Sequence, residues 1–226
     1  MTDISMTSGA AASSGRKAII DAFMTLLAEK PIEEIGVGDV ARQANISLAD
    51  LRGEFSSVLA VFAAHVKETD RIVLSGAAAD MADEPVREKL FDVLMRRLEV
   101  LEPVKPAVRS LLRSSRGNPG LALALNGLAT GSTSWMMSAA GISTAGPKGM
   151  VRAQALTLLY ARVLSTWVDD DDPGLARTMS VLDRELSRGQ RWSGFLDDLF
   201  AIPDRLFRRP PRRRRDPKPD DEIIAA

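Results

Sequence analysis

The stretch RKAIIDAFMTLLAEKPIEEIGVGDVARQANISLADLRGEF, residues 16–55, decides the fold. Its first part predicts a helix that opens near Ser14, a typical N-cap, and ends before Pro31. One face of this helix is apolar at helical spacing, with Ile19, Ala22, Phe23, Leu26 and Leu27. The chain therefore starts with an amphipathic helix that can pack against the residues after it.

Two short helices are predicted in the same stretch. The first of them covers about 37–44, and Asn45 tolerates the left-handed backbone that often ends a helix. Ser47 then caps a helix through about Gly53. Three helices, with a tight turn at 45–48 before the last one, predict a helix-turn-helix unit.

The remaining sequence also has helical periodicity and no sustained alternation of β-branched residues, so the predicted fold is all-α. Proline and glycine positions predict further helices near 56–80, 86–101, 105–115, 120–139, 148–168, 173–188 and 191–207. Asp172 and Pro173 are the expected N-cap and first residue of the 173–188 helix. The predicted organisation is a disordered N-terminus (1–13), a helix-turn-helix head (14–60), a helical body (61–207) and a basic disordered tail (208–226).

Composition excludes several classes of protein. The 226 residues are 45% hydrophobic, enough to bury a full core, and they include no cysteine, which excludes disulfides, thiolate zinc sites and thiol nucleophiles. The single histidine, His65, cannot form a multi-histidine metal site. We therefore predict that the protein is not an enzyme and that it has no cofactor and no metal site. Without a long apolar run or a signal sequence, the expected location is the cytoplasm.

The head resembles the N-terminal domain of TetR-family regulators, which carry a segment of the type T-V-x-D-I-A-x-x-A-G-V-S; here residues 36–47 read GVGDVARQANIS. The resemblance implies a TetR-like fold and a transcriptional regulator that binds double-stranded DNA. The positions that would contact DNA are Lys17, Arg42, Ser47, Leu48, Ala49 and Arg52.

The third helix departs from the family pattern S-x-G-T-L-Y-x-H-F-x-x-K. This chain has SLADLRGEFSSV at residues 47–58, so Leu51 and Phe55 are kept, while Thr, Tyr, His and Lys are replaced by Asp50, Arg52, Glu54 and Val58. From Arg16 to Lys67 there are seven acids and six bases. The head therefore lacks the basic patch that is typical of DNA-binding domains.

The body is similar to the TetR-fold lipid-binding accessory proteins of ubiquinone biosynthesis. The similar stretches are residues 90–113, 130–142 and 159–192. Within the last of them, the pattern W-x-x-D, a threonine and L-D-R-x-L matches Trp167, Asp170, Thr178 and residues 182–186. This resemblance implies an alternative function, a lipid- or isoprenoid-binding accessory protein that does not bind DNA.

A helical body of this size can enclose a cavity for an apolar small molecule or lipid. Aromatic and methionine side chains adapt to such ligands, and the candidates are Trp135, Met136, Met137, Tyr160 and Trp167. The alternative is that these side chains are simply part of the core. The TetR resemblance further implies a homodimer formed by the last body helices, and a two-fold dimer is the commonest closed assembly.

The C-terminal end combines an amphipathic pattern in 191–207 with an arginine-rich run. Residues 208–218 carry a net charge of +6 and residues 1–207 a net charge of −3. Three interpretations remain open: a terminal helix packed on the body, a helix and polybasic segment that make a peripheral membrane contact, and an arm that contacts nucleic acid.

Overall fold

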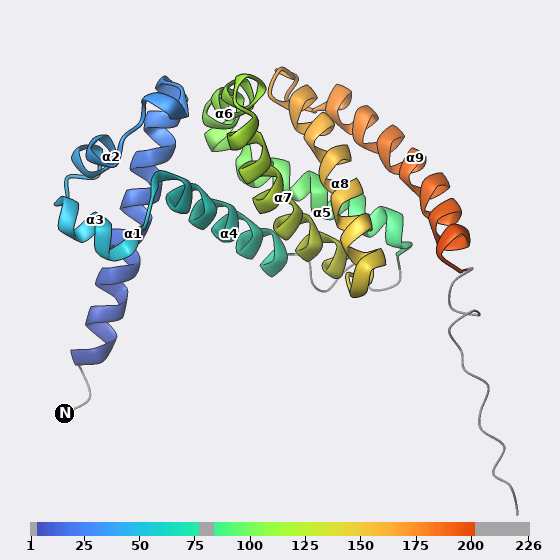
Figure 1. The fold of residues 1–226 in the computed structure, drawn as a ribbon, viewed down its shortest axis with the longest axis horizontal. Coiled ribbons are helices and arrows are strands. Elements are labelled where there is room, and N and C mark those ends of the chain that lie inside the picture. The colour runs from blue at the N-terminus through green and yellow to red at the C-terminus, as the bar shows by residue number, and fades with distance from the viewer. Residues whose placement is uncertain (1–3, 77–83, 202–226) are drawn as a thin grey trace, which may run out of the picture. The chain divides into compact units, whose positions relative to one another are not determined.

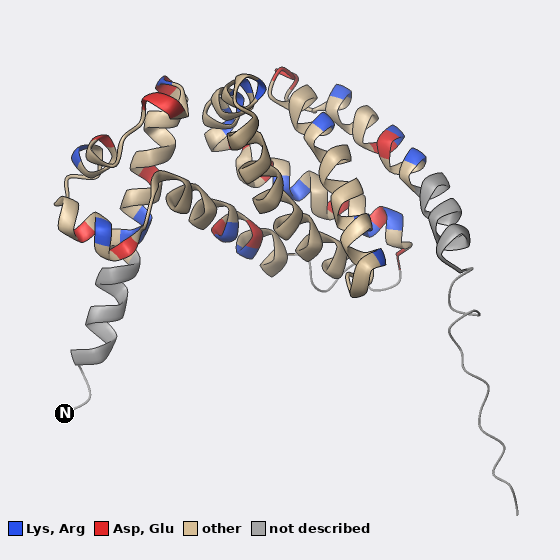
Figure 2. Cartoon of the chain, viewed as in Figure 1, with Lys and Arg blue, Asp and Glu red and all other residues tan. Residues whose placement is uncertain are grey.

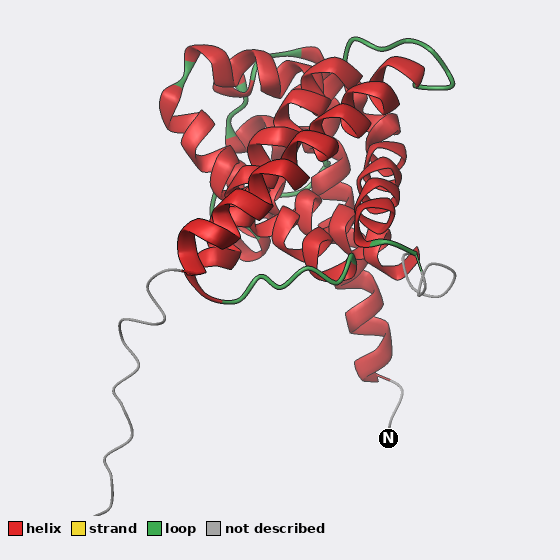
Figure 3. Cartoon of the chain, turned by 90° about the vertical axis from the view of Figure 1, so that its right-hand side faces the viewer, coloured by secondary structure: helices red, strands yellow, loops and turns green. Residues whose placement is uncertain are grey.

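The structure, a computed structural model, describes the backbone of residues 4–76 and 84–201 and the side chains of residues 14–76 and 84–189. The chain divides into two units, residues 1–189 and 190–226, and all the described side chains belong to the first unit. All regular elements of the described ranges are helices (Figures 1 and 3), which confirms the predicted all-α fold. They are α1 (Ile4–Glu29), η1 (Ile32–Glu34), α2 (Val37–Gln43), α3 (Leu48–Glu54), α4 (Val58–Gly76), α5 (Val86–Leu101), η2 (Glu102–Val104), α6 (Lys105–Gly117), α7 (Pro119–Ala139), α8 (Gly146–Trp167) and α9 (Ala176–Ala201).

The helix-turn-helix unit forms as its local sequence predicts. Asn45 has φ = 53°, the left-handed conformation that ends α2, and Ser47 has extended backbone. The Ser47 hydroxyl accepts a hydrogen bond from the Asp50 amide at 3.1 Å, as an N-cap does. Behind the turn, α1, α2 and α3 share a buried cluster that includes Phe23, Leu27, Val40, Leu51 and Phe55.

The first helix is longer than predicted. It begins at Ile4 instead of Ser14. No proline interrupts the segment, and residues 10–12 are three consecutive alanines, the residue with the highest helix propensity. Ser14 is therefore an interior helix residue and not the N-cap.

The long α4 contributes to two hydrophobic clusters. Val61, near its start, is buried in the cluster of the head, and Val73, three turns later, is buried in the cluster of the body. Ala107 and Leu111 of α6 also belong to the head cluster, because α6 packs along α1. The domain boundary predicted at residue 60 thus falls inside a helix that joins the two cores.

The pattern Trp167, Asp170, Thr178 joins α8 to α9. The buried Asp170 carboxylate accepts hydrogen bonds from the Thr178 amide at 2.9 Å and from its hydroxyl at 2.6 Å. The indole Nε1 of Trp167 donates to Glu102 at 3.1 Å, and Lys105 donates to the Asp170 carbonyl at 2.8 Å. The residues of this resemblance therefore have structural roles in closing the end of the body.

The start of α9 differs from the prediction. Leu175 has φ = 50°, so the chain turns once more after Pro173 and the helix begins at Ala176. Asp172 remains close to a capping role, because its carboxylate accepts from the Ala176 amide at 3.1 Å. The helix α9 is continuous from Ala176 to Ala201, where the sequence predicted a break between residues 188 and 191. Residues 202–207 of the second predicted helix lie outside the described residues, and the amphipathic side chains of 191–207 and the arginine-rich tail lie outside the described side chains.

We expect Asp170→Ala to lower the free energy of unfolding by about 1–3 kcal/mol, because it leaves the buried Thr178 amide and hydroxyl without their acceptor. Urea unfolding followed by circular dichroism measures this, with Asp171→Ala, at an exposed neighbour, as the matched control. The Thr178 hydroxyl and amide lower the pKa of Asp170, so its contribution is complete above the ordinary value of 3.8 and is lost as pH falls through the lower folded-state pKa. A difference between wild type and Asp170→Asn that stays constant down to pH 2 would contradict this assignment.

Candidate functional sites

The exposed face of the helix-turn-helix unit carries most of the predicted DNA contacts. Arg42, Leu48, Ala49 and Arg52 are all exposed, and the side chain of Leu48 is 57% exposed although it is apolar. Ser47 lies beside them, but its hydroxyl is used in the cap of α3. Lys17 lies on α1, where its amine donates to Asp21 at 2.6 Å. The α2–α3 unit thus brings five of the six residues together, with Lys17 on a separate helix.

The two acids of α3 are engaged in local contacts rather than free. The Asp50 carboxylate accepts from the Ser47 hydroxyl at 2.6 Å and lies in the first turn of α3, where the helix dipole favours negative charge. The Glu54 carboxylate accepts from Arg16 at 3.1 Å, and the Arg16 guanidinium also stacks 4.3 Å from the centre of the Phe55 ring. Neither acid pairs with Arg42 or Arg52.

The bases of the head are only partly available. Arg42 pairs with Asp39, whose pKa is lowered by the Gly36 amide and by the charges of Lys30 and Arg42. Arg52 donates only a long hydrogen bond, 3.4 Å, to the Ser56 carbonyl. Basic and acidic residues are interspersed along this part of the molecule (Figure 2). The head offers positioned guanidinium groups without a broad positive surface.

A cavity of about 260 Å³ lies within the body, between α4, α5, α6, α7 and α8. Its walls are mostly aliphatic, and its polar groups include His65, Thr69, Arg97, Asn126 and Thr157. Leu158 of α8 lines the cavity and is 53% exposed, so the cavity reaches the surface along α8. Mostly apolar walls with a few polar groups are typical of a small-molecule site.

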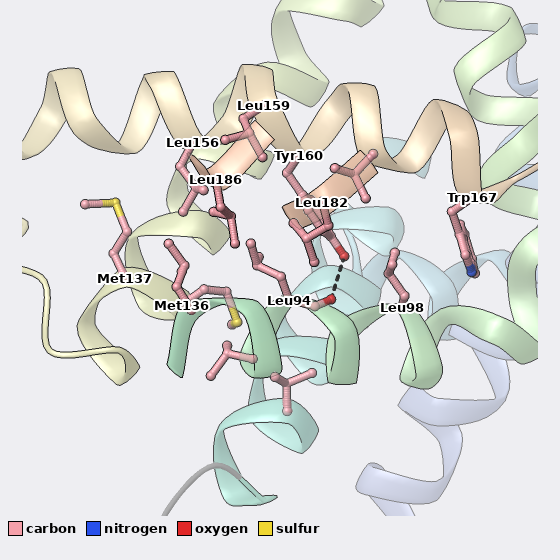
Figure 4. Packing of buried hydrophobic residues seen from close by; sticks show 14 of the residues in the cluster. Leu94, Leu98, Met136, Met137, Leu156, Leu159, Tyr160, Trp167, Leu182 and Leu186 are labelled. Carbon is pink, nitrogen blue, oxygen red and sulfur yellow. Dashed lines mark hydrogen bonds between the residues drawn. The ribbon is translucent and has the colours of Figure 1, made fainter. Parts of the chain in front are cut away.

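The five residues predicted for ligand binding do not line this cavity. Met136, Met137, Tyr160 and Trp167 are packed in the body core (Figure 4), and Trp135 is 62% exposed on α7. Tyr160 points from α8 to α5, where its hydroxyl donates to the Leu94 carbonyl at 3.4 Å; burial raises its pKa, so it stays neutral. Four of the five candidates are therefore ordinary core residues, which was the alternative that the sequence left open.

The sequence did contain a signal for the cavity. Phe62, His65, Val66 and Thr69 follow the spacing i, i+3, i+4, i+7 on α4 and all line the cavity, so a histidine and a threonine interrupt an otherwise apolar helical stripe. Polar residues inside such a stripe need partners when buried, which distinguishes them from the all-apolar stripes of the core.

A buried ion pair holds Arg97, one of the residues that line the cavity. Asp70 of α4 pairs with Arg97 of α5, and the Ser132 hydroxyl of α7 donates to the same Asp70 oxygen at 2.7 Å. The three residues are at most 8% exposed. This cluster fixes α4 against α5 and α7 at the depth of the cavity.

Other site types lack support in the ranges that the structure describes. No group of three or more His, Asp or Glu side chains could hold a metal ion there. No helix of these ranges is long and apolar enough to cross a membrane. A wider hollow of about 600 Å³ between the end of α1 and α6 is open and lined by mixed charges, including Glu29, Lys30 and Arg113.

Comparisons with known proteins connect this arrangement to one fold. No protein-family model matches the chain, and no curated protein matches it. Among solved structures, a TetR transcriptional regulator from Nitrosomonas europaea is similar with a TM-score of 0.61 and 20% identity over 77% of this chain and 97% of that chain. A TetR transcriptional regulator from Rhodococcus sp. RHA1 is similar with a TM-score of 0.55 and 18% identity, over 78% of this chain and 96% of that chain. A TetR-family transcriptional regulator from Streptomyces coelicolor has a TM-score of 0.54 and 14% identity, over 86% of this chain and 88% of that chain. The predicted TetR-like fold is confirmed.

The buried ion pair generates a prediction about stability. Arg97→Met should lower the free energy of unfolding by about 3–5 kcal/mol, because Asp70 is left as an uncompensated buried charge. The double variant Asp70→Asn/Arg97→Met should recover most of this loss, since no unpaired charge remains. A double-mutant cycle by urea unfolding measures the coupling; strictly additive losses would show that the pair does not act as a unit.

Proposed function

We propose that this protein is a TetR-like transcriptional regulator whose head binds operator DNA and whose cavity binds an apolar effector. The observation that supports DNA binding best is the α2–α3 unit. It presents Arg42, Leu48, Ala49 and Arg52 on an exposed face, while Asp50 and Glu54 are held by Ser47 and Arg16. Side chains on the second helix of such a unit reach base edges in the major groove.

The geometry of α4 supports a route from effector to DNA. His65 and Thr69 line the cavity, and Val61, one turn before His65, is buried in the head cluster. A ligand that shifts α4 would therefore also act on the head. Regulation of this kind requires that effector and DNA prefer different conformations of the protein.

We further propose a homodimer formed through α8 and α9. Val151, Leu158 and Met179 are 41–53% exposed although they are apolar, and Ala155 lies between the first two on the same face of α8. Exposed apolar patches of this type mark protein interfaces. A two-fold dimer would also place two heads on two half-sites of DNA.

The alternative is a lipid- or isoprenoid-binding accessory protein that does not bind DNA. Its specific support is electrostatic: from Arg16 to Lys67 the head has seven acids and six bases, and Arg16 and Arg42 are already paired with acids. The mostly apolar cavity suits either function. A peripheral membrane contact in this alternative would use residues 191–226, whose side chains lie outside the described ones.

The test between the two is titration of fluorescent duplex DNA from the protein's own promoter region, at two salt concentrations, beside an unrelated duplex. We expect sequence-dependent binding, and we expect Arg52→Ala to weaken it by about 1–3 kcal/mol if that side chain contacts a base edge. Arg184→Ala, an exposed arginine on α9, is the matched control and should leave affinity unchanged.

Two other results of this titration would change the conclusion. Weak binding with a steep salt dependence and no sequence preference would assign the affinity to the basic residues 208–218 alone. No binding at either salt concentration would replace the regulator with the lipid-binding alternative.

The dimer has its own test. Ala155→Arg places a charge on the apolar face of α8 and should convert the dimer to a monomer at micromolar concentration, as measured by sedimentation equilibrium. Leu123→Arg is the control, because Leu123 is 74% exposed on α7, outside the proposed interface. A wild-type protein that sediments as a monomer at all concentrations would refute the dimer.

A further inference from the structure

The cavity is small, and a few polar groups interrupt its apolar walls. Its volume of about 260 Å³ exceeds the roughly 150 Å³ of an engineered cavity that binds benzene, so it has room for about ten non-hydrogen atoms. Leu111, Leu125 and Leu164 are among the aliphatic residues of its walls, whereas His65 and Arg97 provide a titratable and a charged group. The ligand that fits this distribution is an apolar chain with one polar head group.

His65 carries a buried polar atom that is not hydrogen-bonded to any described residue. Its Nε2 atom is buried and has no hydrogen-bond partner in the part of the chain that the structure describes. A buried polar atom without a partner costs free energy, and a ligand that supplies the partner recovers it. The spacing that turns Phe62 and Val66 toward the cavity also places His65 there.

Arg97 also has free hydrogen-bonding capacity. Its Nη1 atom donates to Asp70, and the structure records no second hydrogen bond for this guanidinium among the described residues. A guanidinium has five N–H donors in a planar fork, which suits a carboxylate. Because Arg97 lines the cavity, a ligand acceptor can reach its remaining donors.

The charges around the cavity determine what a ligand carboxylate would require of His65. Asp70 already neutralises Arg97, so a bound carboxylate would add one uncompensated negative charge. The charged groups that act on His65 are Arg97 of α5 and Asp21 of α1, and Asp70 pairs with the same Arg97. The lining residues on α6 and α7 carry no charge, and the buried Tyr160 of α8 is neutral. A proton on His65 would restore the balance.

We propose that the cavity binds a medium-chain monocarboxylic acid, with its carboxylate at Arg97 and the imidazole of His65, and that His65 takes up a proton on binding. The proposal rests on the proposed function in one respect: the acid would be the effector of the regulator. Burial and the charge of Arg97 lower the pKa of His65 in the free protein, so the imidazole is neutral at pH 7.5. The ligand carboxylate opposes the charge of Arg97 and favours the protonated imidazole, so binding becomes tighter as pH falls from 8 toward 6.

The test is isothermal titration calorimetry of the full chain with octanoate, octan-1-ol and octylamine at pH 7.5. Octanoate should bind at least about tenfold more tightly than octanol, because charge-assisted hydrogen bonds are stronger than neutral ones, and octylamine should not bind. Titrations in phosphate and in Tris, whose ionisation enthalpies differ, should show uptake of up to about one proton.

Variants identify the groups involved. His65→Gln can donate a hydrogen bond but cannot take up a proton, so octanoate should bind more weakly and without proton uptake. Trp135→Ala, at an exposed residue outside the cavity, is the matched control and should leave both quantities unchanged. If His65→Gln does not fold, as thermal unfolding would show, the ranking of the three ligands on the wild-type protein still tests the proposal.

Three outcomes would overturn the proposal: octanol binding as tightly as octanoate, proton uptake that persists in folded His65→Gln, or loss of octanoate binding in Trp135→Ala. None of these measurements involves DNA. A protein that binds octanoate but no duplex would retain this site and lose the regulator function, and a protein that binds its promoter but no octanoate would do the reverse.

Discussion

The buried ion pair between Asp70 and Arg97 is the interaction on which the rest of the body depends. Two charges removed from water are stable only as a pair with further hydrogen bonds, and Ser132 supplies one of these. The pair therefore fixes the depth and rotation of α4 relative to α5 and α7. That rotation turns Phe62, His65 and Thr69 to the cavity and, two to three turns before Asp70, places Val61 in the head cluster.

The head also contains acidic side chains that need a structural explanation, Asp50 and Glu54 on the helix expected to face DNA. Acids on a DNA-facing helix raise the cost of approaching phosphates, but Asp50 and Glu54 each have a local function that accounts for their presence. Asp50 completes the cap of α3, and Glu54 fixes Arg16, which also covers Phe55. Without these contacts α3, a helix of two turns, would have little to stabilise its ends. The acids therefore stabilise the element that presents Arg52, at the expense of the positive potential around it.

How much was predictable depends on the range of each interaction. The α2–α3 unit depends on contacts within a few residues, namely the left-handed Asn45 and the Ser47 cap, so the sequence predicted it closely. The starts of α1 at Ile4 and of α9 at Ala176 depend on weaker local preferences, and both predicted starts, near Ser14 and at Pro173, were wrong. The cavity is a tertiary feature: whether Met136 or His65 faces it depends on how α4 and α7 rotate against α5, and the Asp70–Arg97 pair that sets this rotation joins residues far apart in sequence.

The arrangement of α4 also limits how a ligand could act on the head. Val61 and His65 are one helical turn apart, and a helix of 19 residues transmits a rotation or shift along its whole length. Asp70 resists such movement because it is tied to two other helices, through Arg97 of α5 and Ser132 of α7. A head group that accepts from the remaining donors of Arg97 would share the guanidinium that holds Asp70 and would add charge next to His65. The ion pair thus supports the resting position of α4 and also includes the group that a ligand in this cavity would bind, so ligand binding and the position of α4 would be linked through Arg97.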